Sequence, residues 1–229
     1  MVSAIIVAAG KGERLAGGKD KPFVSLGGQT LLSYSLALFE KVPEVAAVIL
    51  VVAEKRRKDA GLLVSRHNFR KVKRIVAGGT IRQKSVENGL AVIAAETRTV
   101  LIHDAARPFV SEKKVKELIR KGRKSAVIPV LPVSDTLKEI EAGRVLRTLD
   151  RRCFYTVQTP QAFPKDIILT AYRQAKDTGL VGTDDASLLE AAGFPVEIIE
   201  GEKTNIKITY PEDLLAAEAI LRASYGISD

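Results

Sequence analysis

Two kinds of hydrophobic pattern alternate along the 229-residue chain. Short apolar runs rich in β-branched residues predict strands near residues 5–8, 48–52, 72–76, 100–103 and 125–130. Between them, stretches in which apolar residues recur every three or four positions predict helices near residues 31–40, 55–65, 82–95 and 112–121. Because strands that alternate with helices pair in parallel through helical crossovers, the pattern predicts an α/β fold built on a single doubly wound, mostly parallel sheet.

The alternation stops between Pro132 and Gln161. Residues 135–139 and 145–149 predict two short strands around Glu141-Ala142-Gly143, a pattern typical of a β-hairpin. We therefore expect an inserted arm over residues 133–158. Since no helix follows to cover it, the arm must pack elsewhere on its own subunit or on a partner.

After the arm the helix and strand patterns resume. We expect helices near residues 165–176 and 184–192, strands near 196–199 and 205–208, and a closing helix over 211–223. The chain contains no internal repeat, low-complexity segment or linker, and 46% of its residues are hydrophobic. Residues 1–229 are therefore expected to form a single domain with a sizeable core.

Composition excludes several classes of protein. The single cysteine, Cys153, rules out an intramolecular disulfide and a cysteine-based zinc cluster. No apolar run approaches the ~20 residues of a membrane-spanning helix, and no stretch has the pattern of a signal peptide. We expect a cytoplasmic protein.

The formal charge of +9 would suit a nucleic acid, an anionic membrane or a phosphate-rich small ligand. Apolar residues interrupt the basic clusters at 55–58, 70–74 and 113–124, as expected for solvated faces of helices and strands. No helix-turn-helix, zinc-finger or aromatic RNA-binding motif accompanies them. We therefore expect neither nucleic acid nor a membrane as a partner.

A glycine-rich turn, Ala8-Ala9-Gly10-Lys11-Gly12-Glu13-Arg14-Leu15, follows the first predicted strand. Backbone N–H groups in such a turn, at the carboxyl end of a parallel strand, can surround phosphate oxygens. Arg14 and the nearby Lys21 can neutralise the charge of a triphosphate. The spacing excludes a P-loop and also a dinucleotide fingerprint, which needs glycine where Leu15 stands. The alternative is a flexible surface loop with stray charges.

Asp104 follows the strand predicted at residues 100–103, at the same edge of the sheet as the glycine-rich turn. A carboxylate there could hold Mg²⁺, or another divalent cation, against the phosphates of a nucleotide. The alternatives are a cap for the next segment and an ion pair with Arg107. His103 is expected to be a packed core residue rather than a general base.

The turn from Gly10 to Arg14, with Lys21 downstream, resembles the nucleotidyltransferase superfamily. Five further motifs resemble, in this order, those of the methylerythritol phosphate cytidylyltransferase family: His103-Asp104-Ala105-Ala106-Arg107-Pro108, Asp150-Arg151, Thr159-Pro160-Gln161, Thr183-Asp184-Asp185-Ala186-Ser187 and Asn205-Ile206-Lys207. The resemblance runs from Ile5 to about Leu221. It implies a Rossmann-like nucleotidyltransferase that joins CTP to methylerythritol phosphate and releases pyrophosphate.

The resemblance also implies roles for individual residues. It assigns transition-state stabilisation to Arg14, Lys21 and Lys207. It assigns nucleotide binding to Ala8, Ala9, Gly10, Gly12, Gly79, Thr80 and Ser85. It assigns binding of the acceptor substrate to Asp104, Ala105, Arg107, Thr136, Arg151 and Thr159, with Asp104 also the metal ligand. In this family, arms of the predicted kind interlock in a homodimer and deliver the threonine and arginine matching Thr136 and Arg151 to the partner's site.

Some positions depart from the family pattern or allow a second interpretation. Thr80 stands where the family commonly has an acidic residue, and Asp20 where it usually has proline, so that Lys19 competes with Lys21 for the catalytic role. Ser85 could be only a helix-start residue. Asp184 is interpreted first as a helix N-cap.

Two other functions compete with this prediction. A ribitol 5-phosphate cytidylyltransferase would share the glycine-rich turn and the His103-Asp104-Ala105 motif, and would differ in its acceptor pocket. A non-catalytic module that binds nucleotides or nucleic acid would agree with the basic charge, and would release no pyrophosphate.

Overall fold

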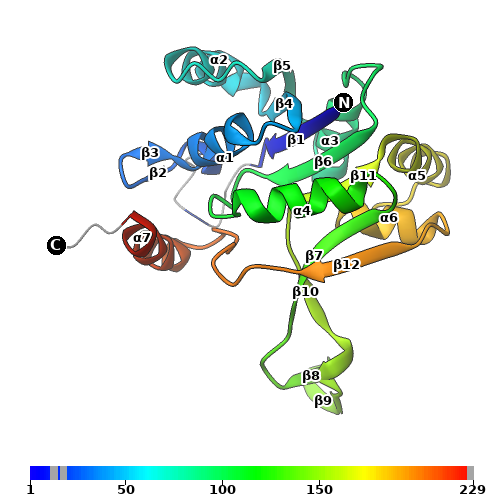
Figure 1. The fold of residues 1–229 in the computed structure, drawn as a ribbon. Helices are drawn as coiled ribbons and strands as arrows, with labels where there is room; N and C mark the ends of the chain where they lie inside the picture. The colour runs from blue at the N-terminus through cyan, green and yellow to red at the C-terminus, as the bar shows by residue number, and fades with distance from the viewer. Residues whose placement is uncertain (11–14, 16–19, 226–229) are drawn as a thin grey trace.

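The computed structural model describes residues 1–10, 15 and 20–225, and a mostly parallel β-sheet forms its centre. The strands lie in the order β10-β7-β11-β6-β1-β4-β5, and β12 also pairs with β7 (Figure 1). Their bounds are β1 (Val2–Ala8), β4 (Val45–Val52), β5 (Val72–Ala77), β6 (Thr99–Asp104), β7 (Ala126–Pro132), β10 (Tyr155–Val157), β11 (Gln161–Pro164) and β12 (Val196–Glu200).

Parallel pairing dominates the middle of the sheet. β1 pairs in parallel with β4 on one side and β6 on the other, so Ile5 lies beside both Ile49 and Ile102. β4 pairs with β5, and β7 with β12, in the same sense. The short strands β10 and β11 run antiparallel to their neighbours and are not among the strands that the pattern predicts. The mostly parallel sheet is confirmed.

Helices cover both faces of the sheet. They are α1 (Leu31–Lys41), α2 (Arg57–Arg66), α3 (Arg82–Leu90), α4 (Glu112–Gly122), α5 (Lys165–Thr178) and α6 (Asp185–Ala191). Because successive side chains of a strand point to opposite faces, Ile5 and Ile6 of β1 lie in separate buried clusters. Ile6 shares its cluster with residues of α1, α2 and α4, and Ile5 with residues of α3, α5 and α6. The doubly wound α/β architecture is therefore confirmed.

The closing helix, α7 (Pro211–Tyr225), packs outside these layers. It lies against the small hairpin formed by β2 (Ser25–Leu26) and β3 (Gln29–Thr30) (Figure 1). Its Ala217 and Leu221 form a buried cluster with Leu26 and Leu31. This cluster anchors the segment that follows the glycine-rich turn.

The predicted hairpin is confirmed, with its first strand shifted by two residues. β8 (Leu137–Glu141) and β9 (Arg144–Leu149) pair antiparallel around Ala142 and Gly143, which both have positive φ. Figure 1 shows this hairpin projecting from the body of the chain. β10, which belongs to the segment predicted as the arm, pairs with β7 in the main sheet. The separate hairpin is thus shorter than residues 133–158.

Two other predictions differ from the structure. Helix α3 ends at Leu90 rather than near residue 95, because the chain turns at residues 91–92, where the Val92 N–H donates to the carbonyl of Gly89 at 3.3 Å. The strand predicted at 205–208 is wrong. Its apolar residues, Ile206 and Ile208, both pack against the cluster that contains Leu26 and Leu31, but they do so from a loop, where the Ile208 N–H donates to the carbonyl of Ala106 at 2.9 Å.

None of the helices among the described residues is long and apolar enough to cross a membrane.

Candidate active site

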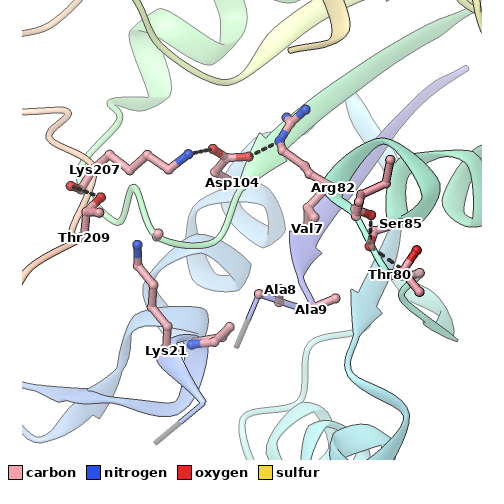
Figure 2. A pocket seen from close by; sticks show the side chains of 15 residues that line it. Val7, Ala8, Ala9, Lys21, Thr80, Arg82, Ser85, Asp104, Lys207 and Thr209 are labelled. Atoms are coloured by element: carbon pink, nitrogen blue, oxygen red, sulfur yellow. Dashed lines mark hydrogen bonds and ion pairs between the residues drawn. The ribbon is translucent and has the colours of Figure 1, made fainter. Parts of the chain in front are cut away.

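A pocket of about 740 Å³ opens at the carboxyl ends of β1, β5 and β6. This is the edge of a doubly wound sheet at which ligands bind. Figure 2 shows the side chains that line it. They are Val7, Ala8, Ala9, Gly10, Lys21, Pro22, Gly79, Thr80, Ile81, Arg82, Ser85, Asp104, Ala106, Lys207 and Thr209.

The end of β1 forms one wall of the pocket through Ala8, Ala9 and Gly10. The turn after β5 closes in from the side, and its Gly78 is needed for that approach, because a Cβ there would collide with the Cβ of Ala9. The predicted Gly12 and Arg14, and the competing Lys19, lie outside the described residues.

Lys21 begins a one-turn 3-10 helix, η1 (Lys21–Phe23), that follows the glycine-rich turn. Figure 2 shows its side chain extending into the pocket from below the pair formed by Asp104 and Lys207. Pro22 is buried and completes this part of the wall. A lysine amine is thereby delivered to the same space that the end of β1 lines.

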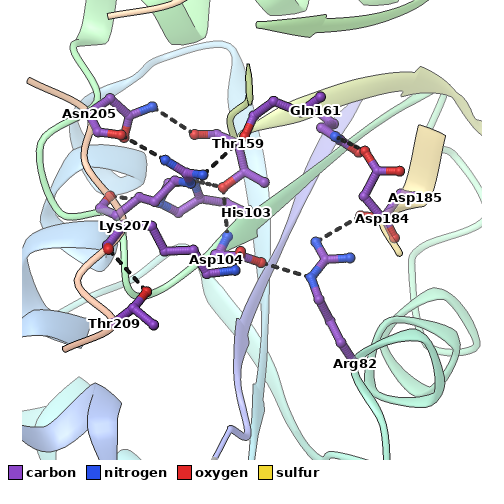
Figure 3. A network of polar contacts seen from close by, with 12 residues as sticks. Arg82, His103, Asp104, Thr159, Gln161, Asp184, Asp185, Asn205, Lys207 and Thr209 are labelled. Atoms are coloured by element: carbon purple, nitrogen blue, oxygen red, sulfur yellow. Dashed lines mark hydrogen bonds and ion pairs between the residues drawn. The ribbon is translucent and has the colours of Figure 1, made fainter. Parts of the chain in front are cut away.

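Asp104 is held between two cations. One carboxylate oxygen accepts from Arg82 Nε at 2.9 Å and the other from Lys207 Nζ at 2.7 Å (Figures 2 and 3). Burial raises the pKa of Asp104, but the charges and hydrogen bonds of Arg82 and Lys207 outweigh it and hold that pKa well below its ordinary value. Asp104 is therefore an ionised carboxylate at neutral pH.

Arg82 bridges Asp104 to a second carboxylate. Its NH2 group donates to Asp185 Oδ2 at 2.8 Å, and Tyr172 donates its hydroxyl proton to Asp185 Oδ1 at 2.6 Å. Burial lowers the pKa of Arg82, but the two carboxylates outweigh burial and raise it above its ordinary value. Helices α3, α5 and α6 are thus joined to β6 by one chain of hydrogen-bonded polar groups, three of them charged.

Arg82 and Asp185 are site residues that sequence reasoning missed. Asp185 belongs to the Thr183–Ser187 motif, whose Asp184 was interpreted as a helix cap. That interpretation is confirmed, since Asp184 Oδ1 accepts from the N–H of Ser187 at 2.9 Å. Because Asp184 caps the helix, Asp185 is the first residue of α6. The predicted cap could therefore have drawn attention to Asp185.

Thr159 holds the backbone of Asp104 through a hydrogen bond on the side away from the pocket. The Asp104 N–H donates to Thr159 Oγ1 at 3.0 Å, and the same oxygen lies 3.2 Å from His103 Nδ1 (Figure 3). Thr159 is buried and does not line the pocket. Within a single subunit, the Thr159 hydroxyl therefore supports Asp104 and His103 rather than facing the pocket.

His103 is a packed core residue, as predicted. It is fully buried, and its ring meets Phe39 edge-on at a centroid distance of 5.3 Å. Burial lowers the pKa of His103 to about 4, so the imidazole is neutral at pH 7. It has neither the exposure nor the basicity of a general base.

Ala105 and Arg107 lie beside the pocket without lining it. Ala105 is buried, and its N–H donates to the carbonyl of Val7 at 3.0 Å. Arg107 donates to the carbonyls of Asn205, at 2.8 Å, and Val157, at 3.1 Å. The alternative of an ion pair between Asp104 and Arg107 is wrong, because Arg82 and Lys207 take that place.

Gly79, Thr80 and Ser85 all line the pocket. The hydroxyl of Ser85 accepts from the Gly79 N–H at 3.0 Å and donates to the carbonyl of Ile81 at 3.1 Å. It therefore shapes the turn before α3. Thr80 is exposed, and Figure 2 shows it on the side of the pocket away from Lys21.

Thr136 and Arg151 stand apart from the pocket. Both are exposed, neither lines it, and Arg151 donates to the carbonyl of Ser134 near the base of the arm. A single chain does not bring them to Asp104.

The donor set for a divalent cation is small. Among the residues that the structure describes, no three His, Cys, Asp or Glu side chains cluster to form a metal site. Asp104, however, is ionised and uses one lone pair of each oxygen in its ion pairs, so each retains another. One carboxylate fits Mg²⁺, which commonly takes its other ligands from substrate phosphates and water.

Comparisons with known proteins agree with this geometry. The family model described as 2-C-methyl-D-erythritol 4-phosphate cytidylyltransferase matches residues 2–223. Proteins of that name from Geobacillus kaustophilus and Halalkalibacterium halodurans are 46% and 44% identical to the chain. The alignments cover 95% and 96% of this chain, and 96% of each relative.

A solved structure agrees as well. The crystal structure of 4-diphosphocytidyl-2C-methyl-D-erythritol synthase from Anaerococcus prevotii superposes with a TM-score of 0.85 at 33% identity, covering 96% of this chain and 98% of that one. Sequence and fold match together over nearly the whole length, and the chain belongs to the 2-C-methyl-D-erythritol 4-phosphate cytidylyltransferase family.

Proposed function

We propose that the protein transfers CMP from CTP to 2-C-methyl-D-erythritol 4-phosphate, forming 4-diphosphocytidyl-2-C-methyl-D-erythritol and pyrophosphate. This is a step of the non-mevalonate route to isoprenoid precursors. The observation that carries the proposal is the set of charges in one pocket at the carboxyl ends of the strands, where Arg82 and Lys207 pair with the ionised Asp104 and Lys21 lines the same space.

The reaction is an in-line displacement at the α-phosphorus of CTP. A phosphate oxygen of the acceptor forms the new P–O bond, the bond from the α-phosphorus to the bridging oxygen breaks, and pyrophosphate leaves. Since the attacking phosphate is already ionised, no general base is required. The neutral, buried His103 is consistent with such a mechanism.

Catalysis then depends on positioning and on stabilising negative charge. Lys21 and Lys207 stand on two walls of the pocket and would stabilise the charge that develops as pyrophosphate departs. Arg14 would join them from the glycine-rich turn. Ala8, Ala9, Gly10 and Gly12 would bind the phosphates, and Gly79, Thr80 and Ser85 the nucleoside.

Asp104 would hold Mg²⁺ or another divalent cation. An ion held there would supply positive charge that stabilises the phosphates of the nucleotide. Thr159 supports this role through its hydrogen bond to the backbone of Asp104. Ala105 and Arg107 belong to the same loop and would position the acceptor.

The acceptor pocket would be completed by a second subunit. The hairpin β8–β9 exposes the apolar side chains of Ile140, Val145 and Leu146. A two-stranded hairpin is marginally stable in water, and burial of these residues in a homodimer would stabilise it. Thr136 and Arg151 would then reach the acceptor in the partner's site. The assembly would work in the cytoplasm, without nucleic acid or a membrane as a partner.

Pyrophosphate release tests the proposal. We expect release only when CTP, Mg²⁺ and methylerythritol phosphate are present together. Equal rates with ATP or GTP would remove the claim for cytidine. Preference for ribitol 5-phosphate would reassign the acceptor, and polyanion binding without any pyrophosphate release would identify a non-catalytic module.

A further inference from the structure

Asp20 is a buried carboxylate beside the pocket lysine Lys21. Only 5% of its surface is exposed. Its Oδ2 accepts from Arg56 Nε at 2.5 Å and lies 3.2 Å from Lys55 Nζ. Both cations come from η2 (Glu54–Arg56), the short helix that follows β4. The backbone just before Lys21 is thus tied to the turn after a central strand.

Arg56 makes a second contact on the other side of Lys21. Its guanidinium carbon lies 5.4 Å from the centroid of the Phe23 ring, within the range of a cation–π interaction. Phe23 itself packs against the buried cluster under α1. One guanidinium therefore holds residues 20 and 23, and Lys21 lies between them.

The segment needs such support from elsewhere in the fold. η1 is a single turn, closed by the bonds from the N–H of Phe23 to the carbonyl of Asp20, at 3.0 Å, and from that of Val24 to Lys21, at 3.1 Å. Isolated turns of this kind are unstable in water, since their few hydrogen bonds do not offset the entropy of ordering them.

Arg56 is also oriented by the first turn of the next helix, α2. Its NH1 group donates to Asp59 at 2.7 Å, which leaves the Nε edge turned toward Asp20. Lys55 is the weaker partner, because its amine is largely exposed and forms the longer contact. The geometry favours Arg56 as the principal anchor.

We infer that Asp20 and Arg56 are positioning residues whose ion pair holds η1 so that the amine of Lys21 stays in the pocket. The inference rests on the proposed function, in which Lys21 acts on the phosphates. Neither Asp20 nor Arg56 lines the pocket. Because a small displacement of a catalytic group can lower a rate by orders of magnitude, loosening this pair should reduce kcat through Lys21.

A double-mutant cycle measures that dependence. Asp20→Asn and Arg56→Gln each remove the charge of one partner, and we expect either to lower kcat about fivefold or more. In a Lys21→Ala background the same changes should alter kcat less than about twofold, since coupled residues are non-additive. Arg57→Gln is the matched control, because Arg57 is the adjacent arginine, is exposed and forms its ion pair with Glu54.

An equal loss in both backgrounds, or no loss with Lys21 present, would overturn the inference. Hydrogen exchange of the amides of Phe23 and Val24 supplies a measurement that is independent of turnover. We expect faster exchange in Asp20→Asn and Arg56→Gln, and unchanged exchange in Arg57→Gln. Unchanged exchange in all three variants would also overturn it. A chain that releases no pyrophosphate would contradict the proposed function, while the exchange data would still decide whether the ion pair orders η1.

Discussion

The amine of Lys207 lies 2.7 Å from the carboxylate of Asp104, although 103 positions separate the two residues in the chain. Each is assigned a different partner in the proposed reaction, Asp104 a divalent cation and Lys207 the phosphates. As an ion pair the two side chains neutralise each other in part. A bound metal and nucleotide would compete with this ion pair. Metal binding should therefore depend on the charge of Asp104.

Replacement of Asp104 by Asn tests its role as a metal ligand. The variant keeps the shape of the side chain but removes its charge, so half-maximal activity should require a higher Mg²⁺ concentration and the maximal rate should fall. The measurement is a Mg²⁺ titration of pyrophosphate release. An unchanged titration and rate would make Asp104 structural.

Lys21→Ala should lower kcat by about tenfold or more, because a charge interaction that strengthens in the transition state contributes to turnover as well as to binding. Lys19→Ala should be much milder. Steady-state kinetics on both variants compare the two lysines directly. The reverse order of effects would show that Lys19 is the catalytic lysine.

The neighbours Asp184 and Asp185 should differ in their effect on stability. Asp185→Ala removes the buried carboxylate that Arg82 and Tyr172 share, which leaves the Tyr172 hydroxyl without its acceptor and Arg82 with Asp104 alone, and should lower the free energy of unfolding by about 3 kcal/mol. Asp184→Ala removes a helix cap and the acceptor of the buried Gln161 amide, which donates to Asp184 Oδ2 at 2.7 Å, and should cost about 2 kcal/mol. Urea denaturation of the two variants provides the comparison. Equal losses would argue against a special role for the Arg82 bridge.

Stability should decrease as the pH falls from about 6.5 to about 4. Burial lowers the pKa of His103 from 6.5 to about 4, so within this interval the unfolded chain binds a proton that the folded chain does not. Proton uptake then favours unfolding, and the contribution of the neutral imidazole is present above pH 6.5 and lost toward pH 4. Denaturation curves across this range should have a smaller pH slope in His103→Gln. The same slope in both proteins would contradict the assignment.

The central strands β1, β4 and β6 are buried on both faces, so each of them is a nearly continuous apolar run in the sequence. For this reason the succession of apolar runs and amphipathic stretches predicted the layers of the fold. It failed at residues 205–208, where Ile206 and Ile208 imitate a strand in a segment whose hydrogen bonds go to loops. Short β10 and β11 gave too little pattern to detect.

The site shows a similar division. The position of Asp104 at the edge of the sheet could be predicted, because the carboxyl ends of parallel strands lie at the same edge. Arg82 could not, since an arginine at the start of a helix is usually solvated, and only the tertiary fold brings Asp185 to it across 103 positions of sequence. The tie between Asp20 and Arg56 is hidden for the same reason.

The last prediction concerns Arg151, which lies at the base of the arm and away from the pocket of its own chain. If a homodimer exchanges these arms, Arg151 of one subunit and Lys21 of the other form one site. Mixing Arg151→Ala and Lys21→Ala chains, each of low activity alone, then gives mixed dimers with one intact site each. Random pairing makes half of the dimers mixed, so about a quarter of normal activity should return, as expected for a two-fold symmetric dimer. No recovery, despite subunit exchange confirmed by mass spectrometry, would place both residues in sites of a single chain.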